Sequence, residues 1–169
     1  MKIIVNDANI LIDLVELNLL DAFFKLNYEF RTTELILDEL ITEQQDALRP
    51  YIEKEKLIVD NITEKDWDEI LTIMASKPTL SEQDCSAFCH AKKNSAALIT
   101  SDNTLRKFAK ANNLQIYGHL WVFDILVQKE LISHNTAIEK LNKLRYFINP
   151  KLGLPKNECQ KRINLWNKQ

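Results

Sequence analysis

Four acidic side chains stand at positions from which they could act on one substrate: Asp7, Glu39, Asp84 and Asp102. Asp7 and Asp102 each come directly after a short apolar run that is typical of a buried strand. Glu39 and Asp84 fall within predicted helices, Asp84 in the first turn. Mg²⁺ and Mn²⁺ prefer oxygen ligands, and such ions activate water and stabilise the oxygens of a phosphodiester. The four acids therefore predict metal-dependent hydrolysis at one shared site.

Each of these acids also has a purely structural interpretation. Asp7 and Asp102 could cap the helices that follow them, and Asp84 could complement the dipole of its helix. Glu39 could be a solvated helix residue. Two neighbouring acids could take its place: Glu34 and Asp38. The four acids together are explained less easily in this way than any one of them alone.

Apolar runs alternate with amphipathic segments along the whole chain. Strands are predicted over residues 2–6, 28–31, 56–60, 96–101 and 115–117, with helices between them. The segment after Thr33 is predicted to be a helix that carries Glu39 and reaches Ile41. This alternation predicts a three-layer α/β/α fold with a central, mainly parallel five-stranded sheet. Ligands bind such sheets outside the carboxyl ends of the strands where the strand order reverses, so Asp7 and Asp102 would share a crevice there.

Composition excludes several classes of protein. The chain has 169 residues, of which 46% are hydrophobic and 27% charged, with a formal net charge of −2, as expected for one globular domain. It has 2 glycines and neither a Walker nor a dinucleotide-binding glycine motif. No signal peptide is expected, and no apolar run approaches the roughly 20 residues that cross a bilayer. The 3 cysteines, an odd number, indicate a reducing compartment, and we expect a soluble cytoplasmic protein without a membrane partner.

The charge is unevenly distributed. Residues 140–169 hold eight Lys or Arg against one acid, Glu158, for a net charge of +7, which leaves −9 for residues 1–139. A basic end suits contacts to a phosphate backbone, although a solvated helix face is an equally good explanation. Five basic residues are candidates for contacts to the phosphates of a nucleic acid, which the resemblance described next implies to be RNA: Arg106, Lys107, Lys110, Lys161 and Arg162.

Four segments resemble the motifs of PIN-domain proteins, in the same order along the chain. The opening motif is matched by Asn6–Leu14, the second by Leu37–Leu40, the third by Leu80–Ala87 and the fourth by Leu98–Arg106. The resemblance covers roughly residues 1–147. It implies a PIN-like nuclease domain over residues 1–149, with residues 150–169 as a basic helical extension packed on the same domain.

The resemblance also implies the roles of particular residues. Asp7, Glu39, Asp84 and Asp102 would be catalytic, with Asp7, Asp84 and Asp102 holding Mg²⁺ or Mn²⁺ and Glu39 binding or orienting the attacking water. Two polar residues would orient the carboxylates or water: Asn9 and Ser101. The implied activity is endonucleolytic cleavage of RNA, and many small PIN proteins are toxins of toxin–antitoxin pairs, which implies an antitoxin partner and a homodimer. The longer middle, about residues 43–77, and the basic extension weaken the toxin assignment more than the nuclease assignment.

Other functions fit the residues less well. A zinc site at Cys85, Cys89 and His90 would need further ligands that the sequence offers only scattered, so these are better explained as core residues. A haloacid-dehalogenase-type phosphatase would need a second aspartate where Asn9 stands, and a receiver domain would need a lysine near residues 115–118. A non-catalytic RNA- or protein-binding PIN-like module remains the main alternative.

The aromatic residues and one histidine are assigned to packing. Trp67, Trp121 and Trp166 recur at helical spacing with other apolar residues, so core packing is expected in preference to base stacking. His119, close to Trp121, is expected to be a packed loop histidine in preference to an RNA contact.

Overall fold

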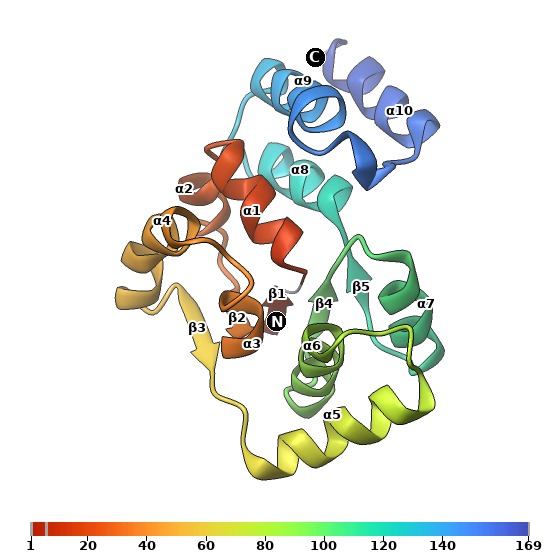
Figure 1. Ribbon diagram of the computed structural model, residues 1–169. Coiled ribbons are helices and arrows are strands. Elements are labelled where there is room, and N and C mark those ends of the chain that lie inside the picture. The colour runs from red at the N-terminus through yellow and green to blue at the C-terminus, as the bar shows by residue number, and fades with distance from the viewer. Residues whose placement is uncertain (1, 6, 169) are drawn as a thin grey trace.

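Five short strands pair in the order β3-β2-β1-β4-β5 (Figure 1). The strands are β1 Lys2–Val5, β2 Glu29–Thr33, β3 Leu57–Asp60, β4 Ala97–Ile99 and β5 Ile116–Tyr117. Each strand runs parallel to its neighbour. The computed structural model describes residues 2–5 and 7–168, so Asn6, predicted to end the first strand, lies outside the described residues. The α/β class is confirmed, and the strands are only two to five residues long.

Helices connect the strands and extend the chain beyond the sheet. The α-helices are α1 Ala8–Glu16, α2 Leu20–Phe23, α3 Glu34–Leu37, α4 Thr42–Glu53, α5 Glu64–Ser76, α6 Glu82–Lys93, α7 Asn103–Ala111, α8 His119–Gln128, α9 His134–Lys143 and α10 Lys156–Trp166. A π-helical turn, η1 Leu144–Ile148, continues α9, and a 3₁₀ turn, η2 Pro150–Leu152, precedes α10. Within the described residues, no helix has the length and apolar character needed to cross a membrane.

The strand order reverses between β1 and β4. From β1 the chain builds outward through β2 to β3, then returns past β1 to add β4 and β5 on the other side. Since crossovers between parallel strands are right-handed, the helices of the two halves lie on opposite faces of the sheet. Helix α6 contacts β1, β2 and β4, and α5 packs against α6 (Figure 1). The crevice at the carboxyl ends of β1 and β4 is therefore where a ligand is expected.

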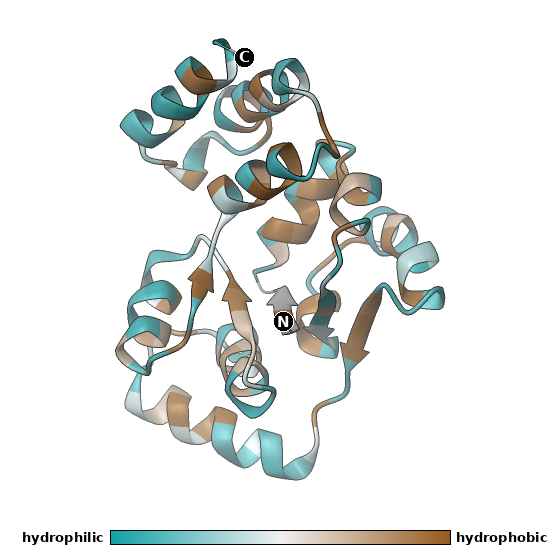
Figure 2. Cartoon of the chain, turned by 180° about the vertical axis from the view of Figure 1, so that it is seen from behind, coloured by the Kyte–Doolittle hydropathy of each residue, from teal (hydrophilic) through white to brown (hydrophobic). Residues whose placement is uncertain are grey.

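The core fills the space between the sheet and the helices. Figure 2 shows apolar residues on the strands and near the centre of the molecule, with hydrophilic residues concentrated on the outer helices. The largest completely buried side chains include Phe23, Phe30, Phe123 and Ile3. Phe23 and Phe30 join α2 to β2, with ring centroids 4.3 Å apart. This packing fixes the sheet and leaves its carboxyl edge to the loops and helix N-termini.

The helix predicted to carry Glu39 is shorter than expected. Thr33 caps it as predicted, but α3 ends at Leu37, and Glu39 lies in the following turn. The cause is the side chain of Gln45, whose amide donates to the carbonyls of Leu37 (3.1 Å) and Leu40 (2.9 Å). These bonds satisfy carbonyls that a longer helix would have used, and so they end the helix there.

The C-terminal segment packs on the helices before it. Helix α10 contacts α9, and it buries Cys159 and Trp166. The Arg162 guanidinium holds both carboxylate oxygens of Asp124 on α8, at 2.8 and 2.7 Å. The division of the chain at residue 149 stays a prediction, and a truncation there would uncover buried side chains.

Candidate active site

Three of the four predicted acids lie at helix N-termini: Asp7, Asp84 and Asp102. Asp84 is the third residue of α6, where its Oδ2 accepts the Ser81 N–H (3.1 Å) in a capping box. Asp102 is the N-cap of α7, and its Oδ1 accepts the Leu105 N–H (2.7 Å). Asp7 is the N-cap of α1. The capping interpretation is thus confirmed, and the partial positive charge of three helix N-termini favours carboxylates at this edge.

Asp7 is held in an unusual backbone conformation. Its φ of 64° and ψ of 106° fall where non-glycine residues are uncommon and where backbone strain is often associated with function. Asn9 fixes the side chain, because its backbone N–H (3.1 Å) and its amide Nδ2 (2.8 Å) both donate to Asp7 Oδ1. Asn9 was predicted to orient carboxylates or water, and the structure places it against the Asp7 carboxylate.

Three of the four acids influence one another electrostatically. Burial raises the pKa of Glu39, and the charges of Asp7 and Asp84 raise it further. Burial also raises the pKa of Asp7; Asn9 and His119 act against this shift, and Asp84 adds to it. A carboxylate whose pKa is raised by neighbouring like charges is held near them by the fold against their repulsion, so a cation at this edge would be stabilised.

The donor set suits a hard cation that retains water. Within residues 2–5 and 7–168, no three acidic, histidine or cysteine side chains are grouped closely enough to enclose an ion. Mg²⁺ does not need such a cage, because it commonly keeps several waters and binds through one or two carboxylates. The residues fit Mg²⁺ or Mn²⁺ by their oxygen donors and by their mutual repulsion.

The pKa shift of Glu39 predicts a pH dependence of stability. A carboxyl group whose pKa is raised in the folded state destabilises that state when ionised, and the penalty disappears as the pH falls through its pKa. Glu39→Gln should therefore be more stable than the wild type at pH 7 without divalent metal, with the advantage shrinking toward pH 4.5. Urea denaturation of both proteins across this range measures the difference. An advantage that is constant with pH would contradict the shift.

A buried polar chain adjoins the acids and was not predicted. Ser101 Oγ lies 2.8 Å from Nδ1 of His119, and its role in orienting a carboxylate or water stays a prediction. The His119 Nε2 lies 3.0 Å from Asp13 Oδ2, although no hydrogen-bond partner lies along its N–H direction in the described chain. Asn149 donates to the same Asp13 oxygen at 3.0 Å. Asp13 and His119 are only 2% and 4% exposed, so this is a buried polar contact that joins α1 to the start of α8 and to Asn149, the residue after η1.

One signal in the sequence could have revealed Asp13. It lies on the buried stripe of α1, between Ile10 and Leu14 and four residues before Leu17. An acid on an apolar stripe must find a buried partner, because an unpaired buried charge is costly. His119 is packed, as predicted, but the sequence does not show that Asp13 is its partner 106 positions earlier.

The cysteines of α6 belong to the core, as predicted. Cys85 and Cys89 are free and buried. Burial raises the pKa of Cys85 to about 11 and that of Cys89 to about 12, so both remain protonated near neutral pH. A protonated, buried thiol is a poor nucleophile and a poor metal ligand.

Comparison with known proteins decides the family. The family model described as "PIN domain" matches residues 3–154. The chain belongs to the PIN-domain family. A search of curated proteins finds no match. Among solved structures, a chain of the VapBC2 complex from Rickettsia felis, bound to a DNA fragment from its promoter, is similar with a TM-score of 0.48 and 16% identity over 70% of this chain and 98% of that one.

Membership confirms the resemblance that the four motifs indicated. PIN domains are generally nucleases, which assigns this chain at a coarse level to the hydrolases. The match reaches residue 154, beyond the boundary predicted at residue 149. The loop between η2 and α10 is therefore part of the matched PIN domain.

The basic residues of α7 differ in whether the fold already uses their hydrogen-bond donors. Arg106 is engaged by the fold, because its Nη1 donates to the carbonyls of Thr100 (2.7 Å) and Tyr117 (2.9 Å) and so joins the ends of β4 and β5. Lys107 and Lys110 are exposed. The two lysines keep the surface position that an RNA contact requires.

The basic residues of α10 are engaged in ion pairs. Arg162 binds Asp124 and also donates to the carboxylate of Glu158 (3.2 Å). Lys161 lies 2.7 Å from the other oxygen of Glu158. Any contact of these two residues with RNA would compete with acids already in place, and their predicted role stays a prediction.

Position 118 requires a glycine because neighbouring atoms leave too little space for a Cβ. Its backbone is extended, so φ imposes no need for glycine. A Cβ there would lie 3.1 Å from Nη1 of Arg106, 3.2 Å from Ser101 Oγ and 3.3 Å from the Thr100 carbonyl. Gly118→Ala should cost about 1–3 kcal/mol of unfolding free energy by displacing these groups. Urea denaturation measures the cost, and an unchanged midpoint would show that the PIN domain can open space there.

Proposed function

We propose that this PIN domain is an endoribonuclease that depends on Mg²⁺ or Mn²⁺. The observation that carries the proposal is the electrostatic coupling of Asp7, Glu39 and Asp84, with Asp102 at the end of the strand beside β1. Asp7, Asp84 and Asp102 would hold the ion, directly or through its bound waters. When bound, the ion supplies acidified water and neutralises charge on the phosphate.

The chain's own groups would position the substrate and the water. Glu39 lies in a turn, is more exposed than Asp7, and has a raised pKa, so it is suited to accept a hydrogen bond from the attacking water and to take its proton. Lys107 and Lys110 would contact the phosphate backbone. Binding of RNA should therefore weaken as the salt concentration rises.

Cleavage of a mixed RNA pool by the purified full chain tests this function. Reactions contain Mg²⁺, Mn²⁺ or EDTA, with single-stranded DNA and a phosphate monoester as further substrates. Asp84→Asn is the matched variant, because an asparagine oxygen can still accept the Ser81 N–H. We expect internal RNA cleavage that requires metal and is lost in this variant.

Other outcomes would favour the alternatives. RNA binding without cleavage would favour a non-catalytic binding module, and monoester hydrolysis without RNA cleavage would favour a phosphatase. Equal cleavage by wild type and Asp84→Asn would point to a contaminating nuclease and contradict the proposal.

The toxin role, an antitoxin partner and a homodimer stay predictions from the family resemblance. Each has a direct measurement in the native host: growth arrest on expression, a small protein copurifying with the chain, and the mass of the purified chain in solution. The nuclease proposal does not depend on any of them.

A further inference from the structure

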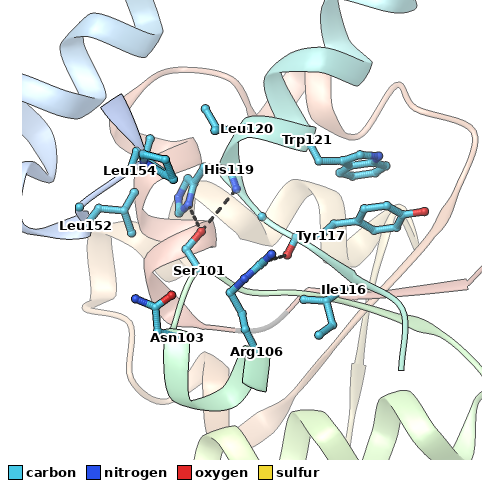
Figure 3. A pocket seen from close by; sticks show the side chains of 13 residues that line it. Ser101, Asn103, Arg106, Ile116, Tyr117, His119, Leu120, Trp121, Leu152 and Leu154 are labelled. Atoms are coloured by element: carbon cyan, nitrogen blue, oxygen red, sulfur yellow. Dashed lines mark hydrogen bonds between the residues drawn. The ribbon is translucent and has the colours of Figure 1, made fainter. Parts of the chain in front are cut away.

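A cavity of about 360 Å³ opens at the carboxyl ends of β4 and β5 (Figure 3). Three segments line it: the start of α7 with the residue before Asp102, residues 116–121, and residues 152–155, which run from the end of η2 to the residue before α10. It shares Ser101 and His119 with the buried polar chain, and Ser101 and Asn103 flank Asp102 on either side. The cavity therefore borders the candidate active site, although the four predicted acids are not among its lining residues.

The chemistry of the cavity differs from that of the acids beside it. Among the described residues that line it, none is acidic, and its polar side chains include Ser101, Asn103, Arg106 and His119. The hydrogen bonds that Arg106 makes within the described residues both use Nη1, so its Nε–H and Nη2–H donors remain for a ligand. An acceptor-rich ligand fits this lining better than a cation or an ammonium group.

The remaining walls are largely apolar, and two of the side chains that form them are aromatic. Figure 3 shows Leu152 and Leu154 on one side of the site and Tyr117 and Trp121 on the other, with Arg106 between them. The two aromatic rings are stacked, with centroids 4.1 Å apart and planes 20° apart. Trp121 packs against the core, as predicted, but it is only partly buried and also lines this cavity. Apolar faces around a few hydrogen-bond donors are typical of sites that bind a planar heterocycle.

We infer that this cavity takes one guanine base of the RNA strand, next to the cleaved phosphate. The inference rests on the proposed function and specifies its substrate. Arginine N–H pairs recognise the adjacent O6 and N7 acceptors of guanine, whereas adenine presents a donor in place of O6. A volume of 360 Å³ lies at the small end of ligand sites, which suits a single splayed base and not a paired one.

The inference assigns selectivity to the loop of residues 152–155. Leu152 and Leu154 supply one apolar wall, so the segment after η1 would determine which base enters. Leu154→Trp should fill the cavity, and Asn103→Ala should remove one polar group without touching the N-cap of α7. Leu71→Trp is the matched control, because Leu71 is exposed on α5 and lines none of the cavities described.

Nucleotide binding tests the cavity without requiring catalysis. The probes are GMP, AMP, CMP, UMP and inorganic phosphate, added without divalent metal to ¹⁵N-labelled full chain while the Trp121 indole and Gly118 amide signals are followed. We expect GMP to shift both signals and to bind about tenfold more tightly than AMP. Leu154→Trp should abolish the GMP shifts, Asn103→Ala should weaken binding, and Leu71→Trp should leave it unchanged.

Several results would overturn the inference. They are equal binding of the four nucleotides, the same shifts with inorganic phosphate alone, and unchanged GMP binding by Leu154→Trp. Sequencing of RNA ends adds a second arm, in which wild type should cut beside guanine and Leu154→Trp should lose that preference. Binding of GMP by a protein that cleaves no RNA would support the cavity and contradict the nuclease; cleavage with no base preference would do the reverse.

Discussion

Replacing Asp7 with asparagine should lower the rate of RNA cleavage by about 10²–10³-fold and leave the folded protein at least as stable as the wild type. The loss of activity follows from removing a charge that would hold the metal ion. The stability is expected because burial raises the pKa of this carboxyl, which shows that the ionised form is disfavoured in the folded state.

The local structure should tolerate the substitution. Asparagine adopts positive φ more readily than most residues and is a good N-cap, and its side-chain oxygen can accept the two bonds from Asn9. Thermal unfolding in EDTA, measured beside initial rates of cleavage in Mg²⁺, separates the two effects. Added Mg²⁺ should raise the melting temperature of the wild type and not that of the variant.

A surface acid provides the control for this experiment. Asp68 is exposed on α5, so Asp68→Asn should change neither the cleavage rate nor the melting temperature. Wild-type cleavage by Asp7→Asn would remove Asp7 from the proposed metal site. A clear loss of stability would show that Asp7 serves mainly as the cap of α1.

The sequence predicts the position of the candidate site because that position depends on local patterns. Apolar runs identify the strands, and an acid directly after a parallel strand must lie at the carboxyl edge of the sheet. The capping box at Ser81 likewise places Asp84 at the start of α6. These features depend on neighbours within a few residues, and the structure has them where they were expected.

Side-chain contacts that no repeating pattern in the sequence reports account for what the sequence did not predict. The helix that should have carried Glu39 ends early because Gln45, six residues beyond Glu39, donates hydrogen bonds from its side-chain amide to the carbonyls of Leu37 and Leu40. The wall formed by Leu152 and Leu154 comes from a segment more than thirty residues beyond Trp121. No periodicity reports such pairings, so the cavity is visible only in the folded chain.

Asp13→Ala should cause the largest loss of stability of any single substitution considered for this chain, about 3–5 kcal/mol. Asp13 Oδ2 is the common partner of His119 Nε2 and Asn149 Nδ2, and both contacts are 3.0 Å long. Truncating one member of a buried polar set leaves the others desolvated without a partner, which costs more than the contact contributes.

A double-mutant cycle distinguishes this explanation from a simple cavity effect. If the cost comes from the stranded histidine, Asp13→Ala combined with His119→Ala should be markedly less destabilised than the sum of the two single variants. A surface pair on α5 and α6, Glu69 and Lys92, lies 3.8 Å apart and is exposed, so its cycle should show a coupling near zero. Additive costs at Asp13 and His119 would contradict a stabilising contact between the two side chains.

The same substitution should also alter the cavity and the candidate site. His119 holds Ser101, which directly precedes Asp102, and Asn149 anchors the chain before the loop of residues 152–155. Without Asp13, His119 and Asn149 would both lose their contact to α1. Hydrogen exchange in Asp13→Ala should therefore rise in residues 149–155 and at the β4–α7 junction while β2 and β3 stay protected. Faster exchange over the whole sheet would instead indicate global destabilisation, and Asp13 would then have no specific part in positioning the site.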